Sequence, residues 1–164
     1  MVPSMAPPDP ASKTKSKSGS GGKLRRQYAA LPIRAGADGC TEILLVTSRG
    51  TQRWIIPKGW PMRRRSPREA AALEAYEEAG VEGIIETEQP IGSYSYRKSL
   101  DNGSIARIEV SIFLLRVVRQ LPSWPEQAER RTRWFSPAEA ADRVAEPELA
   151  AILRGIQAIA GAIR

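Results

Sequence analysis

A helix with both of its ends marked in the sequence constrains the fold of this chain more than any other feature. Ser66 is a favourable N-cap residue, Pro67 suits the first helical position, and Glu69 completes a capping box with the serine. An alanine-rich stretch continues the helical pattern as far as Ala79, and Gly80 is the residue type that most often ends a helix. The sequence therefore predicts one helix whose faces can be assigned residue by residue.

Extended segments surround this helix on both sides. The clearest alternates apolar and polar residues, as a half-buried strand does, and its apolar members are Ala106, Ile108, Val110, Ile112 and Leu114. Further strands are expected at residues 27–34, 42–49, 54–56, 84–98 and 132–135, a loop at 58–65, and further helices from 136 and over 147–163. Because strands and helices do not alternate strictly, the pattern favours an α/β sandwich over a doubly wound sheet.

The composition excludes several kinds of active site. The 164 residues include no histidine and one cysteine, Cys40. Zinc sites with histidine ligands, Ser-His-Asp triads and Cys-His pairs all need an imidazole, so they are excluded. A disulfide within the chain is excluded as well. Acid–base or metal chemistry must therefore rest on carboxylates, with lysine, tyrosine or the backbone in support.

The formal charge of +7, from 25 basic and 18 acidic residues, is concentrated near the N-terminus. Residues 1–23 are rich in Pro, Ser, Gly and Lys, and we predict a disordered basic tail there, followed by one domain over 24–164. We interpret the tail as a solubilising segment, although a nucleic-acid arm is the alternative. Because the sequence shows no apolar stretch typical of a membrane span or a secretory signal, we expect no membrane partner and a cytoplasmic location. The oligomeric state is not indicated.

Three glutamates share one face of the predicted helix. Glu74, Glu77 and Glu78 fall within an arc of roughly 100° at helical spacing. Such closely spaced like charges are mutually destabilising unless they are exposed, protonated or neutralised by a cation. Their oxygen atoms suit a hard divalent ion such as Mg²⁺ or Mn²⁺. The alternative is an ordinary solvated helix face, since glutamate is a good helix former.

The spacing of residues around this face resembles the Nudix box, the loop–helix–loop signature of the Nudix hydrolases. The matching residues are Gly59, Glu74, Glu77, Glu78, Gly80 and Val81. The resemblance implies an α/β/α sandwich with a mixed sheet, forming a Nudix hydrolase domain. It also implies hydrolysis of a diphosphate linkage with Mg²⁺ or Mn²⁺ as the cofactor and a water molecule as the nucleophile.

The resemblance assigns roles to these residues. Glu74 and Glu78 would bind the metal ion, and the Gly59 carbonyl oxygen would be a third ligand. Glu77 would be the catalytic residue, either as general base or by binding the ion through water. Because some relatives place the general base outside the box, two other acidic residues are alternatives: Glu109 and Glu129.

Two positions depart from the family pattern. Arg65 stands where the family usually has a glutamate, and Leu73 stands where it usually has an arginine that helps to orient the glutamates. The first change removes one carboxylate from the site, and the second removes a partner of the metal ligands. These departures keep open a rival interpretation, a non-catalytic Nudix-fold module that binds a nucleotide or RNA.

The opening of the box, residues 57–61, and the run from Trp124 to Phe135 resemble the branch that hydrolyses diphosphoinositol polyphosphates and diadenosine polyphosphates. This branch acts on small, highly anionic phosphorylated substrates, so basic and hydroxyl side chains are expected to bind phosphate. The candidates are Arg26, Ser48, Arg49, Lys58, Arg97, Lys98, Arg107 and Arg133. Trp60 and Tyr96 are the candidates for stacking on a base. An alternative activity is removal of a 5′ diphosphate from RNA, although nucleic acid is not the favoured partner.

Overall fold

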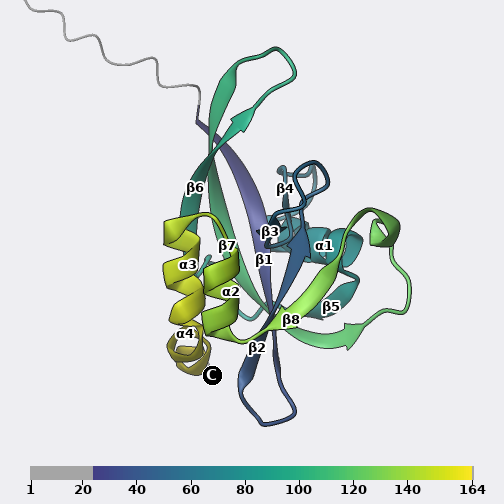
Figure 1. The fold of residues 1–164 in the computed structure, drawn as a ribbon, viewed down its shortest axis with the longest axis vertical. Helices are drawn as coiled ribbons and strands as arrows, with labels where there is room; N and C mark the ends of the chain where they lie inside the picture. The colour runs from purple at the N-terminus through teal and green to yellow at the C-terminus, as the bar shows by residue number, and fades with distance from the viewer. Residues whose placement is uncertain (1–23, 164) are drawn as a thin grey trace, which may run out of the picture.

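The computed structural model of this chain describes residues 24–163, and its centre is a mixed β-sheet (Figure 1). The tail predicted at residues 1–23 lies outside the described residues. In chain order the strands are β1 (Leu24–Ala35), β2 (Thr41–Thr47), β3 (Trp54–Ile55), β4 (Lys58–Gly59), β5 (Val81–Ile84), β6 (Gly92–Ser99), β7 (Ile105–Gln120) and β8 (Thr132–Phe135). The order along the main path is β3-β2-β1-β7-β5, with β4 on β1, β6 on β7 and β8 on β2.

The pairing of β1 makes the sheet mixed, as the sequence predicts. β1 runs parallel to β7, with Arg26 opposite Glu109, and antiparallel to both β2 and β4. The long strand β7 also pairs antiparallel with β6, with Arg97 opposite Arg107. Two residues that pair across neighbouring strands point their side chains to the same face of the sheet. The registers therefore show which residues of β1, β6 and β7 share a face.

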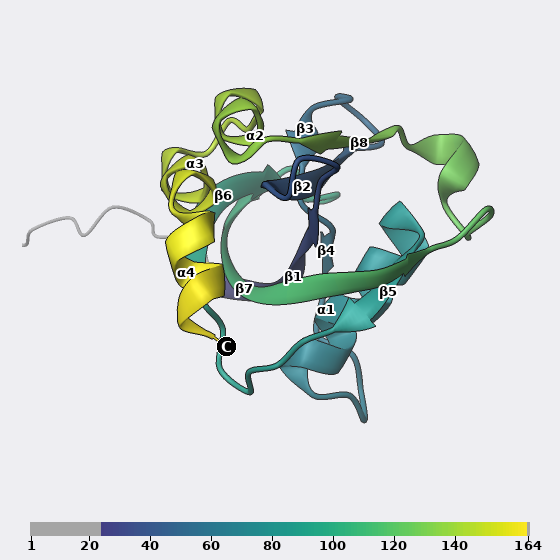
Figure 2. The ribbon, with the colours of Figure 1, turned by 90° about the horizontal axis from the view of Figure 1, so that it is seen from below.

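Helices cover the sheet on both faces (Figure 2). The helix α1 (Pro67–Ala79) packs on one face, and the helices α2 (Pro137–Arg143), α3 (Pro147–Arg154) and α4 (Ile156–Ala162) lie on the other, with a short 3₁₀ helix at Gln127–Glu129. The predicted α/β/α sandwich is therefore confirmed. Within residues 24–163, no helix combines the length and the apolar character needed to cross a membrane.

Alternation along β7 divides the core into two clusters. Ile108, Val110 and Ile112 are fully buried on the face of α2 and α3, as the sequence predicts, while Phe113 and Leu115 are buried under α1. Complete burial of one such side chain is worth about 1.5–3 kcal/mol relative to its exposed state. The alternation therefore fixes which face of β7 each helix covers, because a slip by one residue would expose both clusters.

The ends of α1 lie where the sequence predicts them. The Ser66 hydroxyl accepts a hydrogen bond from the Glu69 backbone N–H at 3.3 Å, and the Ser66 N–H donates to the Glu69 carboxylate at 2.7 Å. At the other end Gly80 has a φ of 66°, and its N–H donates to the Tyr76 carbonyl at 3.1 Å. This geometry needs glycine, because a left-handed residue with a Cβ is strained.

Three expected elements differ from the structure. Lys58 and Gly59, predicted to be loop, form the short strand β4, because they pair with Ala29 and Tyr28 of β1. The single helix expected at 147–163 is interrupted at Gly155, whose conformation separates α3 from α4. The extended segment expected from Ile84 is divided by a connection into β5 and β6.

Replacing Gly80 with alanine is expected to destabilise the fold more than the same change at Gly39, which also has a positive φ of 80°. In both variants the left-handed conformation of the new alanine should lower the free energy of unfolding by about 1–2 kcal/mol. A Cβ at Gly80 would also overlap the indole ring of Trp124, whereas a Cβ at Gly39 would meet no atom. The overlap should add about 1–3 kcal/mol. Urea denaturation of both variants measures the difference, and equal losses would contradict the packing described for Trp124.

Candidate functional site

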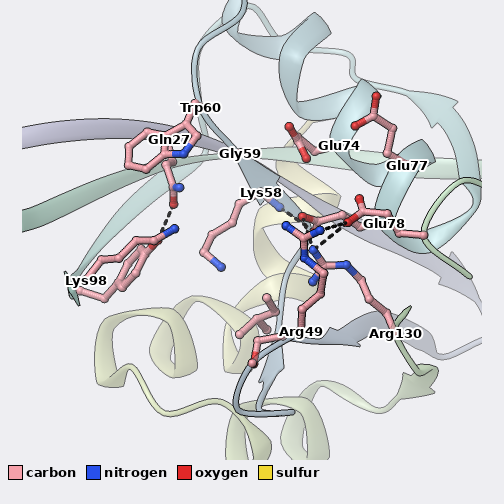
Figure 3. A pocket seen from close by; sticks show the side chains of 15 residues that line it. Gln27, Arg49, Lys58, Gly59, Trp60, Glu74, Glu77, Glu78, Lys98 and Arg130 are labelled. Atoms are coloured by element: carbon pink, nitrogen blue, oxygen red, sulfur yellow. Dashed lines mark hydrogen bonds and ion pairs between the residues drawn. The ribbon is translucent and has the colours of Figure 1, made fainter. Parts of the chain in front are cut away.

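A cleft of about 570 Å³ opens beside β4 (Figure 3). Its walls come from seven parts of the chain: β1, the end of β2, β3, β4, α1, β6 and the segment that joins β7 to β8. Acidic side chains from α1 line one wall, and basic side chains from β4, β6 and the end of β2 line the others. Opposite charges therefore face one space, which suits a ligand that carries both a cation and phosphate groups.

The acidic wall consists of Glu74, Glu77 and Glu78, which α1 presents together (Figure 3). Glu78 is 5% exposed, so this face of the helix is not the solvated surface that the alternative interpretation requires. The Glu74 carboxylate lies directly against the backbone of Gly59, in space that a Cβ on residue 59 would fill. The structure thus brings together all four residues predicted to form the metal and catalytic site.

Glu78 is held from several directions. One carboxylate oxygen accepts a hydrogen bond from the Lys58 backbone N–H at 3.2 Å, and the other accepts from Arg130 Nη2 at 3.2 Å. The side chains of Glu78 and Arg130 are both less than 10% exposed. Because both oxygens are engaged, the rotamer of this carboxylate is fixed before any ligand binds.

Burial raises the pKa of two of these carboxyl groups. The pKa of Glu74 rises to about 8, mainly through burial and then through repulsion from Glu78 and Glu77. Burial raises the pKa of Glu78 to about 7, against the opposing effects of Arg130 and Lys58. Protons therefore compete for these oxygens near neutral pH, and a cation in the cleft would favour the ionised forms.

The basic side of the cleft consists of Arg49, Lys58 and Lys98, and Ser48 lies beside them. In Figure 3 the Lys58 side chain points into the cleft, and burial lowers the pKa of its ammonium group. Its Nζ lies 5.4 Å from the centre of the Tyr96 ring, and Lys98 Nζ lies 5.3 Å from the centre of the Trp60 ring. Four of the predicted substrate-binding residues are thus gathered at one cleft.

A family model decides the relationship of this chain to known proteins. The model, described as the NUDIX domain, matches residues 23–155. The chain belongs to the Nudix family. This match confirms the resemblance seen in the sequence, and four residues of the Nudix box line the cleft: Gly59, Glu74, Glu77 and Glu78.

Individual relatives support the same assignment. Nudix hydrolase 12, mitochondrial, of Arabidopsis thaliana is 34% identical over 60% of this chain and 50% of its own length. Mouse (Mus musculus) diphosphoinositol polyphosphate phosphohydrolase 3-alpha is 31% identical over 71% of this chain and 67% of its own. The chain spans about half the length of the first of these relatives. Because that relative is described as mitochondrial, the cytoplasmic location expected from the sequence stays a prediction.

A solved structure shows the same fold. The crystal structure of C. elegans Ap4A hydrolase superposes with a TM-score of 0.58, covering 83% of this chain and 98% of the other at 18% identity. The Nudix fold of this chain is therefore shown by shape as well as by sequence.

The chemistry of the cleft fits a divalent ion, which Nudix hydrolases generally use. Among residues 24–163, no group of three acidic side chains already stands arranged as a metal site. The donor set nevertheless consists of oxygen atoms only, and the Glu74 carboxylate lies in the space left by the missing Cβ of Gly59. Glu78 already holds a cation, the Arg130 guanidinium. These features suit a hard cation such as Mg²⁺ or Mn²⁺.

Four predicted substrate-binding residues do not line the cleft: Arg26, Arg97, Arg107 and Arg133. The registers place the first three on the sheet face opposite to Lys98, because Arg97 pairs with Arg107 while Lys98 pairs with Ala106 on the other face. Arg133 lies on β8, with its guanidinium 5.1 Å from the centre of the Phe135 ring. The cleft in this structure is therefore bounded without these four side chains.

Three polar or charged side chains that the sequence did not indicate also line the cleft: Gln27, Glu126 and Arg130. Gln27 accepts a hydrogen bond from the Tyr96 hydroxyl at 2.6 Å. Glu126 adds a fourth carboxylate, whereas Glu109 and Glu129, the predicted alternatives for a base outside the box, do not line the cleft. The i, i+4 spacing of Glu126 and Arg130 was the one local signal for this pair.

Alanine at position 59 is expected to disrupt the site without unfolding the protein. The new Cβ would displace the Glu74 carboxylate, which is the flexible end of a side chain, so little backbone must move. Displacing a catalytic group by about 1 Å can cost 10²-fold in rate, and we expect a loss of kcat/KM of about that size. Gly50 also borders the cleft, but a Cβ there meets no atom, so Gly50→Ala is the matched control. Equal activities of the two variants would refute the close approach of Glu74.

Proposed function

We propose that this chain is a pyrophosphohydrolase that cleaves a diphosphate linkage in a small polyanionic substrate with the help of Mg²⁺ or Mn²⁺. The observation that carries the proposal is the arrangement of the cleft, where the acidic face of α1 lies opposite Arg49, Lys58 and Lys98. A site for phosphate alone would not place buried carboxylates beside it, because like charges repel. A divalent ion between the carboxylates and the phosphate would remove this repulsion.

The acidic residues would divide the work of the reaction. Glu74, Glu78 and the Gly59 carbonyl would hold the ion, which when bound neutralises phosphate charge and polarises the phosphorus. Glu77 would accept the proton of the attacking water molecule. It is half-buried, lines the cleft, and makes no side-chain hydrogen bond or ion pair within residues 24–163. A free carboxylate at this place suits general-base catalysis.

The basic residues would bind and orient the substrate. Lys58 extends into the cleft and Lys98 borders it, so both can contact non-reacting phosphates. Arg49 is paired with Glu126 at 3.5 Å but keeps an exposed side chain, which leaves donors for a phosphate oxygen. Fixing the phosphate chain at several points converts binding energy into correct alignment of the scissile bond.

Two substrate classes fit this arrangement. The mouse relative is described as a diphosphoinositol polyphosphate phosphohydrolase and the C. elegans structure as an Ap4A hydrolase. Trp60, 39% exposed at the edge of the cleft, offers a surface on which a base could stack in a dinucleoside polyphosphate. An inositol polyphosphate would instead depend on the number of basic contacts.

A substrate panel tests the proposal. The protein would be incubated with diadenosine tetraphosphate, a diphosphoinositol polyphosphate, a 5′-diphosphorylated RNA and ADP-ribose, in Mn²⁺ or in EDTA, and products followed by ³¹P NMR and chromatography. We expect turnover of at least one of the first two compounds in Mn²⁺ and none in EDTA. Tight binding without turnover of any compound would favour the non-catalytic module instead. Turnover of the RNA alone would favour the RNA 5′-pyrophosphohydrolase.

A further inference from the structure

A buried guanidinium links the acidic wall of the cleft to the rest of the protein. Arg130 Nη2 lies 3.2 Å from Glu78 Oε1 and 3.2 Å from Glu126 Oε1, and Nη1 donates to the Thr47 carbonyl at 3.1 Å. The Arg130 side chain is 6% exposed. Three elements therefore meet at this one side chain: α1, the end of β2 and the segment between β7 and β8.

Leu73 does not hold the glutamates of the acidic wall, because its side chain is uncharged and does not line the cleft. The family pattern places an arginine here to orient the glutamates, but Leu73 lies on the outer side of α1, in a hollow that it shares with Arg65, Glu69 and Glu82. None of these residues lines the cleft. The helix itself therefore supplies no cation that holds the glutamates of the acidic wall.

We propose that Arg130 is the positioning residue of the metal site, taking from outside the Nudix box the part that an arginine at position 73 plays in the family pattern. The inference rests on the proposed function, since it concerns the same site. The Arg130 guanidinium fixes Glu78 and Glu126 relative to each other, so that Glu78 presents one defined arrangement of lone pairs to the ion.

The hydrogen-bond geometry leaves room for that ion. An ionised carboxylate accepts about four hydrogen bonds or ligand contacts. Glu78 uses one on Arg130 and one on the Lys58 backbone N–H, so each oxygen keeps a lone pair for a cation. Arg130 and the ion can therefore share Glu78, and the guanidinium need not leave when the ion binds.

The segment that carries Arg130 is itself fastened to the last turn of α1. The Glu126 N–H donates to the Glu77 carbonyl at 3.0 Å, and Trp124 Nε1 donates to the Glu78 carbonyl at 3.2 Å. The segment that carries the guanidinium is thus fastened to backbone carbonyls of Glu77 and Glu78, beside the carboxylate that it orients. This support makes the arrangement rigid before ligand binding, as a precise metal site requires.

A role in stability alone does not account for this arrangement. Arg130 Nε is buried without a hydrogen-bond partner within residues 24–163. A buried donor that lacks a partner is unfavourable, and buried ion pairs are often no more stable than apolar residues of similar volume. The guanidinium is therefore better explained by the orientation it gives to Glu78 than by the stability it adds.

Mn²⁺ binding to purified variants tests the inference without relying on turnover. We expect Arg130→Gln to weaken Mn²⁺ binding by about 10- to 100-fold, measured by electron paramagnetic resonance on the substrate-free protein. The value of kcat should fall as well, whereas KM at saturating Mn²⁺ should stay near that of the wild type. Arg130→Lys keeps the charge and a nitrogen that can donate to both carboxylates, but it loses the second donor, which Arg130 Nη1 gives to the Thr47 carbonyl, so it should give an intermediate Mn²⁺ affinity. The control is Arg119→Gln, which removes an exposed arginine that pairs with Glu82 outside the cleft and should leave Mn²⁺ affinity unchanged.

The outcomes separate this inference from the proposed function. Unchanged Mn²⁺ affinity in both Arg130 variants would overturn the inference, and a raised KM alone would make Arg130 a substrate-binding residue. A lower melting temperature with normal Mn²⁺ affinity would overturn it too, by showing a purely structural role. If Arg130→Gln does not fold, Arg130→Lys decides. The wild-type protein could also turn over no diphosphate while the Arg130 variants lose Mn²⁺ affinity. That result would support the role of Arg130 and reject the proposed function.

Discussion

Replacement of Glu77 by glutamine is expected to lower kcat for a diphosphate substrate by about 10²- to 10⁴-fold, the usual contribution of a general base. Glutamine has nearly the same shape, and the Glu77 side chain has no hydrogen-bond partner to lose within residues 24–163. The free energy of unfolding should therefore change little. Steady-state kinetics together with urea denaturation measure both quantities on the same preparation.

Glu78→Gln should have a different effect from Glu77→Gln. Glu78→Gln removes a metal ligand and leaves the buried Arg130 guanidinium with less compensating charge, so Mn²⁺ affinity and stability should both fall. Glu82→Gln is the control, because that carboxylate is exposed, pairs with Arg119 and lies outside the cleft. Full turnover in both Glu77→Gln and Glu78→Gln would reject the assignment of the site to α1. Full turnover in Glu77→Gln alone would move the general base to another carboxylate, with Glu126 next to be tested.

Mn²⁺ affinity is expected to rise steeply with pH between about 6 and 8. The pKa values are raised to about 8 for Glu74 and about 7 for Glu78, so an ion that binds both must displace protons in this range. Each proton displaced makes affinity change by about tenfold per pH unit, and because the two groups interact, the steps belong to the pair. The dependence should level off above about pH 8. Titrations of Mn²⁺ at pH 6, 7, 8 and 9 measure it, and a constant affinity would contradict the raised pKa values.

The stability of the metal-free protein should have the opposite dependence. Both pKa values lie above the ordinary value of 4.5, so the folded protein binds protons that the unfolded chain releases. This contribution is fully present below about pH 4.5 and is lost as the pH rises through 7 and 8. The ionisation of Glu74 and Glu78 should therefore make the melting temperature in EDTA lower at pH 9 than at pH 6. Glu74→Gln should reduce this difference, and Glu82→Gln should not.

The sequence was informative wherever the signal was local. The ends of α1 follow from Ser66, Glu69 and Gly80, whose effects act within one turn of the helix. The faces of β7 follow from strict alternation. The strand β4 could not be predicted, because its two residues are extended only through their pairing with β1, far away in the sequence.

The same distinction explains the site. Glu74, Glu77 and Glu78 could be predicted, because helical spacing and the family pattern are local. Arg130 reaches Glu78 across 52 positions of the chain, so only the tertiary fold reveals the pair. Arg97 and Lys98 were both predicted to bind the substrate, but neighbours on a strand point to opposite faces, and only Lys98 lines the cleft.

The most direct test of the account is the location of Mn²⁺ in a crystal of the protein, from anomalous scattering of the ion. We expect one strong peak in the cleft, beside the carboxylates of Glu74 and Glu78 and the Gly59 carbonyl, with Arg130 still paired to Glu78. A peak only at other sites, or none at a Mn²⁺ concentration that supports turnover, would contradict the account.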